Sequence, residues 1–159
     1  MQELKNIQTM EALNKKLYNA AESGNVDLVY SCLQKGADVH YKNVFGETPL
    51  HLSAQVGNTE VTKFLVEAGA SLSAVDHWGR TPLHMAAWGR YSKATKVLVE
   101  AGASLSAVNN EGRTPLHSAA WAGNTEVTKA LVEAGASLSS VDNEGWTPLH
   151  MSAQEGTQR

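Results

Sequence analysis

The chain has 159 residues, of which 42% are hydrophobic and 18% are charged, and its net charge is −3. This is the composition of an ordinary globular domain, and the acidic balance argues against a nucleic-acid-binding surface, which is usually basic. The single cysteine, Cys32, excludes an internal disulfide, and no apolar run is long enough for a membrane span or an N-terminal secretion signal. These features predict an intracellular, most simply cytoplasmic, protein that binds neither nucleic acid nor membrane.

The first predicted element is a long helix that runs from near the start of the chain to about Glu22. Apolar side chains recur there every three or four residues: Leu4, Ile7, Met10, Leu13 and Leu17. The segment that follows matches the later part of the chain in phase but lacks its most regular motif. We therefore predict that residues 1–42 form an N-terminal helical cap unit with a polar outer face.

The motif TPLH then occurs four times at a constant spacing of 33 residues. It begins at Thr48, Thr81, Thr114 and Thr147. A period of this length is typical of an array of stacked units, each of which is too small to bury its apolar face alone. The spacing predicts three full repeats and a truncated last one, with the limits 43–75, 76–108, 109–141 and 142–159.

Each full repeat predicts two short helices. Thr48 is a suitable N-cap for the first helix, and Pro49 suits its first turn, where a missing N–H costs nothing. Gly57 is expected to end that helix in a left-handed conformation. Thr59 is expected to cap the second helix, and Gly69 to end it.

The pattern resembles the ankyrin repeat. The residues that carry the resemblance are G-x-TPLH, the spacing of the two helices and V-E-A-G-A, from about residue 43 to residue 156. The resemblance implies an all-α solenoid of stacked helix–turn–helix units with projecting hairpin-like turn tips. It also implies a non-enzymatic protein–protein interaction module, with a concave binding surface made by the tips and the first helices.

Histidines also recur with the repeat, and a metal site is the alternative to test. They are His51, His84, His117 and His150. Packed helices lie about 8–10 Å apart, whereas ligands of one zinc ion each lie about 2 Å from the metal, so neighbouring histidines cannot share an ion. We expect each imidazole to bond to the turn backbone instead. Cys32 occupies the position of Leu65 and is expected to be a buried apolar side chain. No spacing indicates a catalytic group or a cofactor site, so we predict no enzyme, no cofactor and no metal.

The aromatic and charged residues near the tips and first helices are the candidate partner-binding residues. Exposed aromatic side chains bury a large area on binding and lose few torsions. By the resemblance, these positions border the concave surface, although Trp121 and Trp146 could instead pack between repeats, and the two arginines before TPLH could be solvated charges. The predicted set is Phe45, His77, Trp78, Arg80, Trp88, Arg90, Tyr91, Glu111, Arg113, Trp121 and Trp146.

One repeat departs from the others between its two helices, where it reads GRYSKATK. Arg90 takes the place of the helix-ending glycine, which predicts that Gly89 ends the helix one residue earlier. Ser92 is expected to cap the second helix as Thr59 does. Drift is one explanation of this segment. We favour the other, that repeat 76–108 carries the centre of the binding surface.

The copies are alike enough to leave other functions open. Between residues 59–75 and 125–141, only two of 17 residues differ. Such likeness indicates recent duplication or deliberate copying. The alternatives to a natural binding module are therefore an engineered ankyrin scaffold or binder, and a structural spacer that is part of a larger array. We expect a monomer, and the truncated last repeat offers a route to end-to-end association.

Overall fold

The structure is a computed structural model that describes residues 1–158, and all regular secondary structure among them is helical. The helices are α1 (Gln2–Ser23), α2 (Val26–Gln34), α3 (Pro49–Gln55), α4 (Thr59–Glu67), α5 (Pro82–Trp88), α6 (Ser92–Glu100), α7 (Pro115–Ala122), α8 (Thr125–Glu133) and α9 (Pro148–Gln158).

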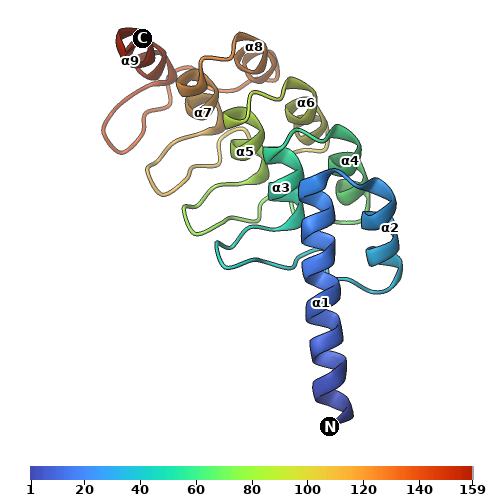
Figure 1. Cartoon of the computed structure of the whole chain (residues 1–159). Coiled ribbons are helices and arrows are strands. Elements are labelled where there is room, and N and C mark those ends of the chain that lie inside the picture. Colours follow the sequence, from blue (N-terminus) through green and yellow to red (C-terminus); the bar gives the residue numbers. More distant parts are fainter. Residues whose placement is uncertain (159) are drawn as a thin grey trace.

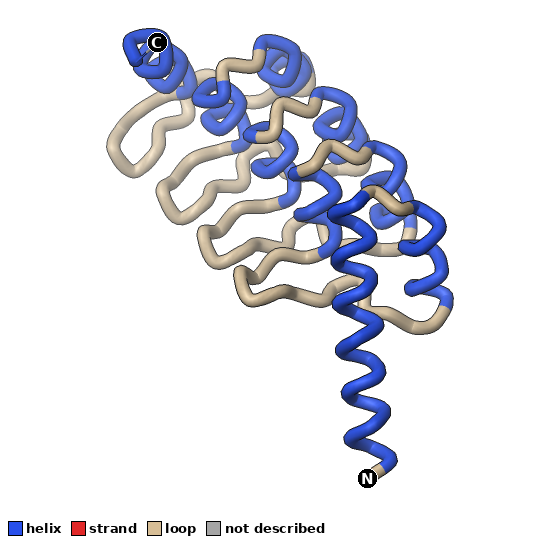
Figure 2. The backbone as a smooth tube through the Cα atoms, in the orientation of Figure 1, coloured by secondary structure: helices blue, strands red, loops and turns tan. Residues whose placement is uncertain are grey.

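The helices stack in two layers (Figure 1). The layer of first helices contains α1, α3, α5, α7 and α9, and each packs on the next; the second layer contains α2, α4, α6 and α8. Long loops project side by side from one edge of the stack and form the tips (Figure 2). The predicted all-α solenoid of helix pairs with projecting turns is therefore confirmed.

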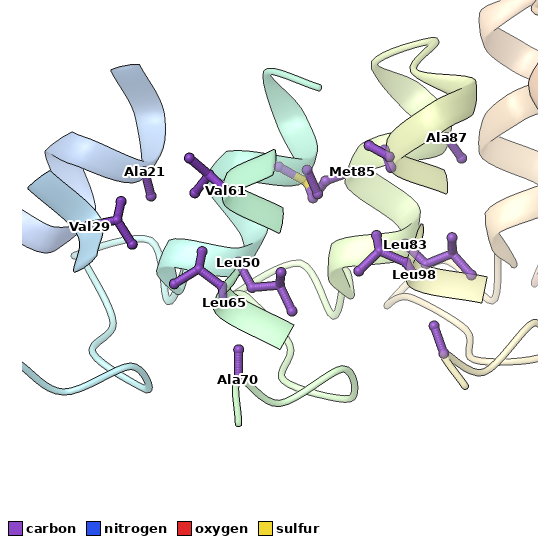
Figure 3. Packing of buried hydrophobic residues seen from close by; sticks show 14 of the residues in the cluster. Ala21, Val29, Leu50, Val61, Leu65, Ala70, Leu83, Met85, Ala87 and Leu98 are labelled. Atoms are coloured by element: carbon purple, nitrogen blue, oxygen red, sulfur yellow. The ribbon is translucent and has the colours of Figure 1, made fainter. Parts of the chain in front are cut away.

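The core runs along the stack as one continuous apolar layer. Leu50, Leu83 and Leu116 come from the same place in successive TPLH motifs and are at most 1% exposed. Figure 3 shows Leu50 and Leu65 beside Leu83 and Leu98, so one repeat packs directly on the next. Burying each leucine contributes about 1.5–3 kcal/mol, and no single pair of short helices could provide this alone. Cys32 lies in the same layer and is buried, as predicted.

The first helices begin as the motif predicts. Thr48 has an extended backbone, its hydroxyl accepts a bond from the His51 N–H at 3.3 Å, and Pro49 follows in the first turn. The His51 ring makes the reciprocal bond, because its Nδ1 accepts from the Thr48 N–H at 3.1 Å. The same reciprocal cap recurs at Thr81 and Thr114. Each such cap is worth about 1 kcal/mol.

The second helices begin one residue earlier than predicted. Asn58, not Thr59, is the cap of α4, because its side chain accepts from the Val61 N–H at 2.8 Å. Asn124 caps α8 in the same way, and Asn25 caps α2. Thr59 lies inside the first turn. The prediction of a threonine cap is therefore wrong: the extended residue that follows the left-handed glycine is the asparagine.

Two predictions for the divergent repeat are also wrong. Gly89 has a right-handed backbone, and Arg90 itself adopts the left-handed conformation, with φ 67°. Tyr91, not Ser92, occupies the cap position of α6, and no side chain makes the cap bond there. The backbone of this repeat thus keeps the path of its neighbours, although two of its residues are poorly suited to that path.

The N-terminal helix was predicted correctly, since α1 ends at Ser23, one residue after Glu22. Leu17, Ala20 and Ala21 are buried against the stack. The predicted polar outer face is wrong for the first half of α1, which projects beyond the stack (Figure 1) and leaves Leu4 64% and Ile7 56% exposed. Within residues 1–158, no helix has the length and apolarity needed to cross a membrane.

Candidate functional site

Each tip is folded by one short polar side chain at its start. The Asp76 carboxylate accepts bonds from the Trp78 N–H at 3.0 Å and the Arg80 N–H at 2.9 Å, and the Asp76 N–H donates to the Arg80 carbonyl. Gly79 closes this turn with φ 75°. The other tips start from Asn43, Asn109 and Asp142 in the same way. Because the first residue and the glycine make the turn, the side chains between them are left available at the surface.

Neighbouring tips are joined through their backbones. The His77 N–H donates to the Phe45 carbonyl, the Asn110 N–H to the Trp78 carbonyl and the Asn143 N–H to the Glu111 carbonyl, each at 3.0 Å. Two asparagine side chains add parallel bonds, from Asn110 to the His77 carbonyl and from Asn143 to the Asn110 carbonyl. The tips therefore form a continuous, ordered array rather than separate loops.

Buried histidines on α3, α5 and α7 form a hydrogen bond between each helix and the tip that follows it. Nε2 of His51, His84 and His117 lies 2.8 Å from the carbonyl oxygens of Arg80, Arg113 and Trp146, respectively. Since Nδ1 of each ring accepts from a threonine N–H, the proton is on Nε2, which donates. The prediction that the histidines bond to turn backbone is confirmed.

Burial has an electrostatic consequence at two of these rings. It lowers the pKa of His51 and His84 below the ordinary value of a histidine, and the hydrogen bonds to the Arg80 and Arg113 carbonyls oppose this only in part. Both rings are therefore neutral at neutral pH. Within residues 1–158, no three His, Cys, Asp or Glu side chains are placed to share a metal ion.

A groove of about 270 Å³ lies on the first-helix side, lined by residues of the last three repeats. We call it the concave groove. Its tip end is polar, its other end is aromatic, and two methionines contribute apolar lining. The lining residues are Arg80, His84, Met85, Trp88, Asn109, Glu111, Arg113, His117, Ser118, Trp121 and Met151.

Both arginines of the concave groove are paired with carboxylates. Arg80 Nε lies 2.7 Å from Asp76 Oδ2, and Arg80 Nη2 lies 3.7 Å from Glu47 Oε1. These arginines are therefore positioned groups, not the freely solvated charges of the alternative interpretation.

The second arginine, Arg113, also pairs with two carboxylates, one in its own tip and one in the following tip. Its Nη1 lies 2.7 Å from Glu111 Oε2, and its Nε lies 3.2 Å from Asp142 Oδ2. Burial acts to raise the pKa of Asp142, but the bonds from the Trp146 and Glu144 N–H groups and from Arg113 outweigh it and hold the pKa below its usual value.

A second aromatic group lies at the tips themselves. The ring centroids of Phe45 and Trp78 are 6.1 Å apart, and the Arg80 guanidinium carbon lies 4.9 Å from the Trp78 ring centroid. Phe45 and Trp78 remain 51% and 50% exposed. Stacked aromatic side chains that stay exposed on an ordered turn are suited to contact with another molecule.

The predicted residues fall into four places. The concave groove brings together Arg80, Trp88, Glu111, Arg113 and Trp121; the tips carry Phe45, His77 and Trp78; the α5–α6 turn carries Arg90 and Tyr91; and Trp146 precedes α9. Tyr91 lies over Gly57 of the preceding repeat so closely that a Cβ there has no room. Trp146 is half-buried, and its carbonyl accepts the His117 bond. Neither Tyr91 nor Trp146 lines the concave groove.

Sequence reasoning missed several groove residues. Met85 and Met151 follow TPLH directly, where the other repeats have Leu52 and Ser118. Comparing that position across the repeats would have signalled them. The carboxylates that pair with the arginines come partly from neighbouring repeats, and no local pattern indicates that pairing.

Comparison with known proteins decides the family. The family model described as "Ankyrin repeats (3 copies)" matches residues 17–109 and again residues 96–159. The chain belongs to the ankyrin-repeat family. Ankyrin repeats are generally protein–protein interaction modules. No curated protein matches this ankyrin-repeat chain.

Proposed function

We propose that this ankyrin-repeat chain is a non-enzymatic, intracellular module that binds a partner protein on the surface formed by the concave groove and the tips. We place the five units of this monomer at residues 1–42, 43–75, 76–108, 109–141 and 142–159. The observation that carries the proposal is the combination of exposed aromatic side chains with an ordered backbone beneath them. Trp78 and Trp88 are 50% and 53% exposed, yet each belongs to a turn or helix that is fixed by hydrogen bonds.

Order in the free protein favours binding. Association must offset the entropy lost when loops and side chains are fixed, and a surface that is already fixed loses less. The bonds between tips and the histidine bonds keep the tips in place before any partner arrives. In a protein that acts only as a spacer, exposed tryptophan would serve no function, and its apolar area would promote non-specific association.

The test compares capture by the wild-type chain with capture by Trp78→Ala and Trp88→Ala. Proteins captured from cell extract are identified, and the affinity of the leading candidate is measured with purified components. Each substitution is expected to weaken binding by about tenfold or more, the range of an interface hot spot, without a change in thermal midpoint. Tyr91→Ala is unsuitable here because Tyr91 packs over Gly57.

Lys129→Ala is the matched control. Lys129 is exposed on α8, in the second layer, where the proposal places no contact. The proposal fails if both tryptophan variants bind every captured protein as well as wild type does. It also fails if the control loses binding as they do.

A further inference from the structure

We propose that the concave groove takes an arginine or lysine side chain from a basic segment of the partner protein. This inference rests on the proposed function and specifies the chemistry of the ligand. It follows from two features of the groove: an excess of carboxylate around its two arginines, and two tryptophans in its lining.

The carboxylates around the groove outnumber the cations that pair with them. Two carboxylates contact Arg80, from Glu47 and Asp76, and two more contact Arg113, from Glu111 and Asp142. Two guanidinium groups therefore meet four carboxylates, which leaves a net charge of −2. The lowered pKa of Asp142 keeps that carboxylate ionised at neutral pH.

The other charges of the tips do not cancel this charge. Lys42 and Glu144 are the two further charged residues of the four tip segments, which together contain three basic residues and five acidic ones and so keep a net charge of −2. They are Lys42, Arg80, Arg113, Glu47, Asp76, Glu111, Asp142 and Glu144. Helices α3, α5 and α7 contain no Lys, Arg, Asp or Glu. Arg90 lies on the turn after α5 and does not line the groove. The groups that line the groove carry both signs, and with the carboxylates paired to them they are net negative, a balance that attracts ligands of positive charge.

The aromatic end of the groove suits the same ligand. Trp88 and Trp121 both line it, and Trp88 is 53% exposed. The face of an indole ring attracts a guanidinium or ammonium group. The protein already uses this contact at the tip, where Arg80 lies 4.9 Å from the Trp78 centroid. Met85 and Met151 lie beneath the groove and are only 2% and 0% exposed, so the indole rings provide the apolar surface for the aliphatic stem of such a side chain.

An acidic ligand fits less well. Both arginines are already paired, so an incoming carboxylate would meet the excess of like charge. A wholly apolar side chain could contact the tryptophans but would leave Glu111, whose side chain is 63% exposed, without a new partner. A cationic group on a long stem is the ligand that satisfies both ends of the groove.

The test is a selection from a displayed library of random peptides of about twelve residues. The wild-type chain is the target, and binding to Trp88→Ala is used to remove peptides that bind elsewhere. The selected peptides are expected to share an arginine or lysine. Replacing that residue by norleucine in a synthetic peptide should weaken binding by about tenfold, and raising the salt from about 50 to about 500 mM should weaken it further.

A charge variant tests the carboxylates directly. Glu111→Gln removes one negative charge and one of the two carboxylates paired with Arg113, so binding of the selected peptide should weaken by about threefold or more. Glu67→Gln makes the same charge change at an exposed position of α4 and should leave binding unchanged. The thermal midpoints of both variants show that the fold is intact.

The outcomes separate this inference from the proposed function. If the selected peptides depend on Trp88 but share acidic or neutral residues, or if Glu111→Gln binds as well as wild type, the cationic ligand is wrong and the binding surface stands. If every peptide that binds wild type is removed because it also binds Trp88→Ala, both proposals fail.

Discussion

Arg90 has a backbone conformation that three glycines have at the equivalent positions of the other repeats. Gly24, Gly57 and Gly123 have φ between 69° and 73°, and Arg90 has φ 67°. The left-handed conformation brings the Cβ of an L-residue close to its own backbone and costs about 1–2 kcal/mol, a cost that glycine avoids. Arg90 therefore destabilises this turn, and the surrounding stack compensates.

Replacing Arg90 by glycine should stabilise the protein. Arg90→Gly is expected to raise the free energy of unfolding by about 0.5–1 kcal/mol, since relief of the backbone strain is partly offset by the greater freedom of glycine when unfolded. Urea denaturation measures the change. Gly123→Ala is the matched control and should lower stability by about 1 kcal/mol. Equal stability of wild type and Arg90→Gly would mean that no strain is present at this turn.

The buried histidines predict a dependence of stability on pH. Because the pKa values of His51 and His84 are lowered on folding, the unfolded chain binds more protons than the folded one below about pH 6.5. Stability should be constant above about pH 7 and fall as the pH drops through 6.5, by at most about 1.4 kcal/mol per pH unit for each ring.

Urea denaturation between about pH 7.5 and pH 5 measures this dependence, well above the range in which Asp142 titrates. His84→Gln removes one of the two rings and should reduce the slope, from a lower starting stability. A free energy of unfolding that rises with acidity would contradict the assignment of neutral, buried rings.

Residue-level prediction succeeded where one cap residue was available and failed where two were adjacent. Thr48 stands alone before Pro49, and it is the cap. Asn58 and Thr59 are both good cap residues, so their chemistry does not decide between them. The backbone decides, since Gly57 must be left-handed and the next residue is the one that is extended.

At the scale of elements, α1 differs from the other first helices in length and exposure. Its 22 residues extend well beyond the part that packs on the stack, and residues 1–12 are exposed throughout. A helical segment of about 12 residues would be marginal in water on its own, so this part depends on its continuity with the packed half of α1. The apolar spacing predicted the helix correctly but could not predict its surroundings, because exposure depends on what the rest of the chain places opposite.

The free half of α1 should contribute little to stability. Simultaneous replacement of Leu4, Ile7 and Met10 by glutamine is expected to change the free energy of unfolding by less than about 0.5 kcal/mol, as exposed positions do. Leu17→Ala, on the buried half of the same helix, should cost about 2–5 kcal/mol. Thermal and urea denaturation measure both. A large loss in the triple variant would mean that this apolar face is covered in solution.

At the scale of the whole molecule, repetition made the fold predictable and left the site only partly so. The constant spacing of TPLH fixes the order of the helices and the packing of Leu50 on its equivalents. The concave groove depends on residues from different repeats that meet only after stacking, such as Arg113 with Asp142. The aromatic members were predicted because they are unusual at exposed positions, and the ion pairs were not because charges are common there.

The array should accept another copy of one of its own repeats. Inserting a second copy of residues 109–141 after Val141 adds one interface of a kind that the stack already contains. Repeat arrays gain stability with each such interface. Both the urea midpoint and the dependence of stability on urea should rise, the latter by about a fifth, in proportion to the added surface. A separate unfolding transition at lower urea would show that the added copy does not couple to its neighbours.

The bond from each histidine to the next tip ends on a main-chain oxygen, and this has an evolutionary consequence. Trp146 accepts the same bond at the same distance as Arg80 and Arg113 although its side chain differs from theirs. A mutation at such a position alters what the surface presents to other molecules and leaves the connection between repeats intact. After a gene segment is duplicated, its copies can therefore acquire different ligands while inheriting one architecture.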